Sequence, residues 1–130
     1  MTGAIRAITT GEAATFLLAS LVHLGALPPL AAALGEPVIP QAGIPEGVIG
    51  VVLVIGAVAA FTGRLGGWRT LIATQAFAVL GTLVGMFALA SGAAPRTDAN
   101  DVYHRVILAA LVVTLVLSVF PGRRPPPVHT

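Results

Sequence analysis

The sequence predicts an all-α membrane protein, a bundle of four transmembrane helices that runs up-down-up-down with both termini in the cytoplasm. Of the 130 residues, 56% are hydrophobic and 9% are charged, whereas a soluble domain has about 25% charged residues. The mean hydropathy is +0.95. Four apolar runs account for nearly the whole chain, and a span needs about 20 apolar residues. Residues 1–122 are therefore expected to form the bundle, with no room for a soluble domain.

The first two spans are bounded by prolines. The four predicted spans cover, in order, about residues 5–27, 44–62, 68–90 and 102–120. Pro28 and Pro29 end the first span, because they lack backbone donors and the residue before a proline avoids helical angles. Leu30–Leu34 (LAAAL) is either a short interfacial turn or a kinked continuation of that span. Pro45 and Glu46 suit the first turn of the second helix.

Turn-forming residues bound the later spans. The short GRLGG connection (63–67) makes spans two and three antiparallel neighbours. SGAAP (91–95) ends the third span, and the polar stretch 96–101 supplies N-cap residues for the fourth. The last residues, RRPPPVHT (123–130), are expected to form an extended, basic, proline-rich cytoplasmic tail.

Arginine placement predicts the orientation. With four spans, the arginines on one side are Arg6, Arg64, Arg69, Arg123 and Arg124. Arg96 and Arg105 fall on the other side, where four acidic residues dilute them: Glu36, Glu46, Asp98 and Asp101. The positive-inside rule then places both termini in the cytoplasm. The membrane that the chain crosses is predicted to be the inner (plasma) membrane.

Composition also excludes several functions. The chain has no cysteine, which excludes disulfides, thiolate metal sites and CxxC redox chemistry in this chain. Its arginines flank apolar runs, so membrane topology explains them and a nucleic-acid partner is not expected. The expected partners are the lipid bilayer and either another membrane protein or further copies of the chain.

Small residues indicate how the helices meet. The second span contains Gly47, Gly50 and Gly56, and the third contains Gly81 and Gly85 in a GxxxG pattern. Small residues let helix backbones approach closely in lipid. The pattern predicts either close packing within one bundle or a homo-oligomer seam through Gly81 and Gly85.

The stretch GEAATFLLASLVHLG (11–25) places Glu12 and His23 on one helical face, about 16 Å apart along the axis. Glu12 is expected to share an inner layer with Gln75, with Thr15 and Thr74 nearby. A carboxyl at this depth is either protonated or paired with an arginine, Arg6 or Arg69. The two interpretations are a proton-accepting or quinone-type site and an interfacial acid held by arginine.

An outer layer is predicted with one residue from each span: His23, Glu46, Met86 and His104. Two imidazoles, a carboxylate and a thioether can bind copper or zinc. The two His residues, or His and Met, can instead be axial ligands of haem b. Two other interpretations stay open. The residues either line a polar pocket that binds a small molecule or carries protons, or they are interfacial residues that bind nothing. His23 is the deepest of the four, and a lone His in a span usually faces the bundle interior.

The text from Glu46 to Gly56 (EGVIGVVLVIG), followed by Gly63-Arg64, resembles the DoxX-like family of small four-helix membrane proteins. In those proteins an acidic residue opens the second span, and an Arg-bearing turn leads into the third. His23-Leu24-Gly25 falls where such chains have a polar residue closing the first span. The resemblance implies an accessory role in membrane redox or stress complexes, although the lack of cysteine speaks against a thiol role for this chain.

The leading functional expectation is a small membrane accessory or binding protein with intramembrane polar sites for a small molecule, quinone or proton. Glu12, Gln75, His23, Glu46 and His104 are its candidate site residues. It is not expected to be an enzyme on its own, since it lacks an extramembrane domain. The alternatives are a haem- or copper-binding redox subunit and an oligomeric small transporter or channel.

Overall fold

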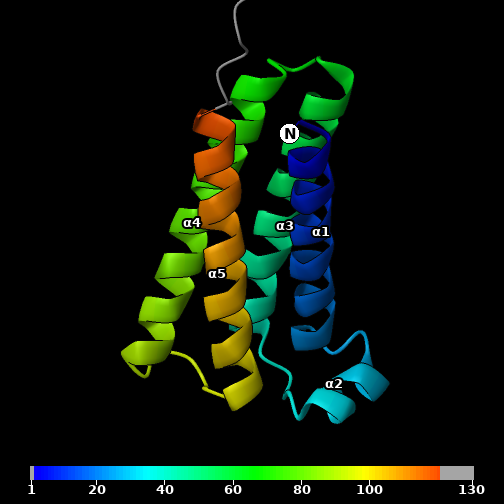
Figure 1. The fold of residues 1–130 in the computed structure, drawn as a ribbon. Coiled ribbons are helices and arrows are strands. Elements are labelled where there is room, and N and C mark those ends of the chain that lie inside the picture. The colour runs from blue at the N-terminus through cyan, green and yellow to red at the C-terminus, as the bar shows by residue number, and fades with distance from the viewer. Residues whose placement is uncertain (1, 121–130) are drawn as a thin grey trace, which may run out of the picture.

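The computed structural model describes residues 2–120 and is all-helical over that range (Figure 1). It has five helices: α1 (Thr2–His23), α2 (Pro28–Leu34), α3 (Pro40–Thr62), α4 (Trp68–Ala90) and α5 (Asp98–Val119). The four long helices are long and apolar enough to cross a membrane, which confirms the predicted class. The predicted tail at 123–130, with Arg123 and Arg124, lies outside the described residues.

The long helices lie side by side as a bundle (Figure 1). α1 packs against α3 and α5, α3 packs against α4, and α4 packs against α5. The short helix α2 and the α4–α5 connection lie at one end of the bundle, which we call the α2 end (Figure 1). The start of α1, the α3–α4 turn and the end of α5 lie at the opposite end.

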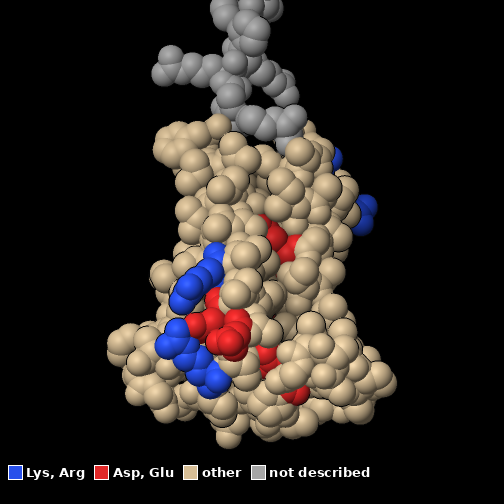
Figure 2. Space-filling model, turned by 60° about the horizontal axis from the view of Figure 1, so that its bottom comes forward, with Lys and Arg blue, Asp and Glu red and all other residues tan. Residues whose placement is uncertain are grey.

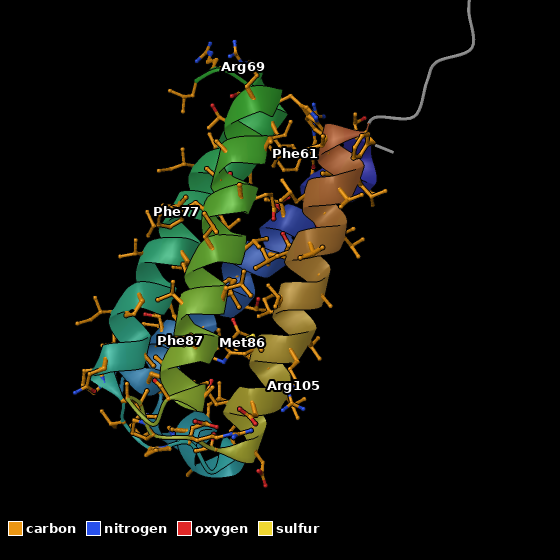
Figure 3. All side chains as sticks on the ribbon, turned by 90° about the vertical axis from the view of Figure 1, so that its left-hand side faces the viewer. Phe61, Arg69, Phe77, Met86, Phe87 and Arg105 are labelled. Atoms are coloured by element: carbon orange, nitrogen blue, oxygen red, sulfur yellow. The ribbon has the colours of Figure 1, made fainter. Side chains whose placement is uncertain are left out.

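The bundle buries small and polar residues and exposes large apolar ones. Its central core contains Phe16, Leu53 and Leu111 together with several alanines, and fully buried threonines lie among them. Phe77 and Phe87 point outward from α4 (Figure 3), and Phe87 is 74% exposed. Such a surface suits lipid, where packing of small residues rather than hydrophobic burial drives helix association.

The α1–α3 connection follows one of the two predicted alternatives. α1 ends at His23, and Leu30–Leu34 belongs to a separate helix, α2, so it does not continue the first span. Gly25 (φ +75°) and Gly35 (φ +66°) provide the left-handed turns on either side of α2, a conformation that glycine adopts without strain. The backbone N–H of Ile39 then donates to the carbonyl of His23 at 2.8 Å.

The start of the second long helix differs from the predicted start. Pro40 takes the early position that had been assigned to Pro45, and Pro45 lies inside α3. Proline suits the first turn because its missing N–H has no helical partner there. Glu46 consequently lies inside the helix rather than in its first turn, and its side chain is buried.

The glycines of α3 and α4 account for close packing within the chain. A Cβ on Gly56 would meet Thr74 of α4, and a Cβ on Gly81 would lie 2.8 Å from Cδ1 of Ile49 in α3. A Cβ on Gly85 would lie 3.5 Å from Nε2 of His104 in α5. The predicted GxxxG pair therefore faces neighbouring helices of its own bundle.

Candidate functional site

A buried acid–imidazole–acid group lies at the α2 end. The Nδ1 atom of His23 is 2.6 Å from Oε2 of Glu46, and its Nε2 atom is 3.3 Å from Oε2 of Glu36. His23 is 3% exposed, Glu46 4% and Glu36 9%. Both ring nitrogens thus face carboxyl oxygens inside a mostly apolar structure.

Each member of this group comes from a different part of the chain. His23 is the last residue of α1, Glu36 follows α2, and Glu46 lies in α3. The hydroxyl of Thr97 donates to Oε1 of Glu36 and accepts from the backbone N–H of Asn100 at 3.1 Å as the N-cap of α5. The group therefore links α1, α3, the α2–α3 connection and the start of α5.

A pocket of about 390 Å³ lies against this group. Most of its wall is apolar, and it includes Leu18, Val22, Leu30 and Leu34 from α1 and α2. The polar side chains in the wall are Thr15, His23, Glu36, Asn100 and Tyr103. The arrangement provides an apolar space with polar groups at the α2 end.

A smaller cavity of about 70 Å³ is lined by Glu46, Asn100 and His104 among others. Within residues 2–120, Oε1 of Glu46, Oδ1 of Asn100 and the hydroxyl of Tyr103 are buried without a hydrogen-bond partner. Two of these three are acceptors only. Buried polar atoms without partners are uncommon in folded proteins, so these oxygens point to a bound donor.

The four predicted outer-layer residues do not form one centre. His23 and Glu46 are in contact, but Nδ1 of His104 bonds the carbonyl of Asn100 at 2.8 Å. Met86 lies on the α5-facing side of α4 (Figure 3) and lines a separate cavity of about 110 Å³ with His104 and Arg105.

The predicted metal set His23, Glu46, Met86 and His104 is therefore not assembled. Among residues 2–120, no group of three or more His, Cys, Asp or Glu side chains is arranged to hold a metal ion. His23 offers no free ring nitrogen to haem b or copper, since carboxyl oxygens face both. Packing explains the difference: residues at one depth need not face one point.

The predicted inner pair does form. Nε2 of Gln75 in α4 donates to Oε2 of Glu12 at 2.6 Å and lies 3.1 Å from Oγ1 of Thr9. The hydroxyl of Thr114 in α5 donates to Oε1 of Glu12 at 2.7 Å. The group thus joins α1, α4 and α5 in the interior of the bundle.

The arginine alternative for Glu12 is not what the structure shows. The guanidinium of Arg6 lies 5.5 Å from the ring centroid of Phe61, and among the described residues no ion pair involves Glu12. Thr15 and Thr74 bond backbone carbonyls of their own helices, at 2.8 and 2.9 Å. Neither threonine reaches the Glu12 carboxyl.

Sequence reasoning missed Glu36, Thr97, Thr9 and Thr114. From the sequence, Glu36 enters only the charge balance on its side of the membrane, because its contact with His23 depends on how α2 folds back. The capping pattern Thr97-x-x-Asn100 was visible in the sequence. Thr9 precedes Glu12 by about one turn, a spacing that places both on one face.

Charged side chains on the surface gather beside the site. Figure 2 shows arginines next to acidic side chains at the α2 end. Arg96 and Arg105 both bond Asp101, the second at 3.4 Å. The hydrogen bond to Asp101 also raises the pKa of Arg96 above its usual value. Asp101 is therefore the partner of both guanidinium groups.

Comparison of the chain with protein-family models, curated proteins and solved structures gave no match.

Proposed function

We propose that the protein is a multi-pass protein of the inner (plasma) membrane, crossing it up-down-up-down with both termini in the cytoplasm. Four long apolar helices support the crossings. Arg6, Arg64 and Arg69 belong to the end of the bundle opposite α2, as Figure 3 shows for Arg69. The positive-inside rule then places the α2 end outside.

Cysteine labelling tests this orientation, because the chain has no cysteine of its own. Leu65→Cys lies in the α3–α4 turn and Ala93→Cys in the α4–α5 connection. A membrane-impermeant maleimide applied to intact spheroplasts should label Ala93→Cys at once and Leu65→Cys only after permeabilisation. Labelling of both from one side, or the reverse pattern, contradicts the proposal.

We further propose that the protein is a binding or accessory protein that holds a lipophilic small molecule in the pocket at His23 and Glu36. The observation that carries this proposal is the 390 Å³ pocket, apolar except for the buried His23–Glu36 pair and its neighbours. Small-molecule sites are typically 300–1,000 Å³, mostly apolar, with a few polar groups that fix orientation.

The ligand would lie with its apolar body along Leu18, Leu30 and Leu34 and its polar end near Glu36 and Tyr103. A quinone-type head and an amine-type head are both members of this class. Residues 2–120 form the bundle and its short connections, so a protein partner would meet them within the membrane or at either end of the bundle. The DoxX-like relationship stays a prediction beside this proposal.

Filling the pocket tests the binding proposal. Ala19 lines the pocket, whereas Ala14 is exposed on the same helix, so Ala19→Trp and Ala14→Trp form a matched pair. Protein in nanodiscs is titrated calorimetrically with a short-chain quinone and with decylamine. At least one probe should bind wild type and Ala14→Trp, with at least tenfold weaker binding to Ala19→Trp. No binding by either probe, or equal binding by both variants, contradicts the proposal.

A haem- or copper-binding redox subunit is not proposed, since both nitrogens of His23 are already in carboxyl contacts. An oligomeric transporter through Gly81 and Gly85 has no specific support either, because both glycines face helices of their own chain.

A further inference from the structure

We propose that the ligand of the His23–Glu36 pocket is a lipophilic amine, bound as its ammonium ion. This inference rests on the proposed binding function and names its ligand class. Two independent observations at the α2 end support it: the net charge of the buried acid–imidazole–acid group, and a buried amide oxygen in the pocket wall, Oδ1 of Asn100, that lacks a hydrogen-bond donor.

The charge follows from counting protons. Two short contacts join His23 to Glu46 and Glu36, at 2.6 and 3.3 Å, and each requires one proton between nitrogen and oxygen. A proton-free ring and two carboxylates carry three negative charges, and two protons leave one. With these two protons and no others, the group carries one negative charge, whether each proton resides on the imidazole or on a carboxyl.

Nearby cations within the described range do not offset this charge. Arg96 and Arg105 both bond Asp101, and Asp98 adds a further acid at the start of α5. From α5, the groups beside the site are the neutral side chains of Asn100 and Tyr103 and the imidazole of His104. A buried charge is costly unless it is paired, so the group favours a cationic ligand.

The hydrogen-bond count agrees with the charge. Both nitrogens of His23 and the hydroxyl of Thr97 already serve the two carboxyls. In the part of the chain that the structure describes, Oδ1 of Asn100 and the hydroxyl of Tyr103 line the pocket without a hydrogen-bond partner. Oε1 of Glu46 also has none, but Glu46 lines the smaller cavity and not this pocket. Asn100, which lines both cavities, is only 3% exposed. A ligand in the pocket that brings N–H groups can donate to Oδ1 of Asn100 and to the hydroxyl oxygen of Tyr103.

Aromatic and aliphatic walls suit the remainder of such a molecule. Tyr103 lines the pocket and packs edge-on against Phe16, with ring centroids 6.0 Å apart. An aromatic face attracts a cation placed within about 6 Å of it. The leucines of α1 and α2 then cover a hydrocarbon chain or ring. An oxidised quinone has only acceptors in its head and could not donate to Oδ1 of Asn100.

The test compares four probes with one decyl chain: decylamine, decanol, decanoate and decyltrimethylammonium. Each is titrated calorimetrically into protein in nanodiscs of neutral lipid, with empty nanodiscs as the blank. Decylamine should bind at least ten times more tightly than decanol or decanoate. Decyltrimethylammonium, which has the charge but no N–H, should bind at least five times more weakly than decylamine.

Matched variants assign the preference to the site. Glu36→Gln removes one negative charge with little change of size, and Asp98→Asn removes the same charge from an exposed position at the same end. The amine preference over decanol should fall to less than threefold in Glu36→Gln and persist in Asp98→Asn. Should Glu36→Gln fail to fold, the four-probe comparison on wild type decides alone.

The outcomes separate this inference from the binding proposal. Decanol, decanoate or a short-chain quinone binding as tightly as decylamine, with binding lost in Ala19→Trp, refutes the amine and leaves the pocket function standing. A preference that survives in Glu36→Gln also refutes it. No binding by any probe overturns both.

Discussion

Gly56 offers a direct test of the helix packing, because a Cβ added to this glycine of α3 would be too close to a side chain of α4. A Cβ at this position would overlap Oγ1 of Thr74 and would lie 3.0 Å from its Cβ. Rotation of the threonine side chain moves Oγ1 but not Cβ, so it relieves only part of the contact. Gly56→Ala therefore forces α3 and α4 apart.

The size of the effect follows from two opposing contributions. Overpacking a close contact costs about 1–3 kcal/mol, while alanine gains about 1 kcal/mol over glycine as a helix former. Gly11→Ala isolates the second contribution, since a Cβ on Gly11 in α1 meets nothing within 4 Å. The free energy of unfolding should therefore be about 1–3 kcal/mol lower for Gly56→Ala than for Gly11→Ala.

Reversible unfolding in mixed detergent micelles, followed by circular dichroism, measures this difference. Thr74→Ala in the Gly56→Ala background removes Oγ1 and should recover part of the loss. If Gly56→Ala is as stable as Gly11→Ala, or if Thr74→Ala recovers nothing, then α3 and α4 do not approach at Gly56 and the packing argument is wrong.

Three further changes test the polar contacts by the same unfolding measurement. Thr97→Ala removes the N-cap of α5 and a donor to the acid group and should cost about 0.5–2 kcal/mol, whereas Thr97→Ser should cost less; equal losses contradict the capping role. Gln75→Leu leaves the buried carboxyl of Glu12 without its amide donor and should cost about 1–3 kcal/mol; an unchanged stability means that this contact contributes nothing. Trp68→Phe removes the 2.9 Å bond to the carbonyl of Ser118 and should cost about 1 kcal/mol, with retained stability arguing against that bond.

The inner polar pair was predictable because it depends on depth and face alone. Glu12 and Gln75 each lie seven positions into their predicted spans (5–27 and 68–90), and a buried acid and a buried amide are stabilised by pairing in an apolar interior. To predict the further partners Thr9 and Thr114, one would need to know how α1 and α5 are rotated about their axes. Apolar sequence on all sides of a helix leaves that rotation undetermined.

The outer layer shows the same limit more strongly. The prediction brought four residues to one depth. The structure joins His23 to Glu46, while His104 shares one small cavity with Glu46 and another with Met86. Pro40 and Pro45 are both acceptable near a helix start. Because α3 begins at Pro40, Glu46 lies inside the helix and not in its first turn.

The sequence by itself determined the all-helical class, the four long apolar helices and the pairing of Glu12 with Gln75, because hydropathy and helical period act over a few neighbouring residues. Only the tertiary structure decided that α2 is a separate helix that brings Glu36 back to His23, and that Gly81 and Gly85 serve packing within the chain. Those outcomes depend on turn geometry and on which faces meet, which are set by contacts between residues distant in the sequence.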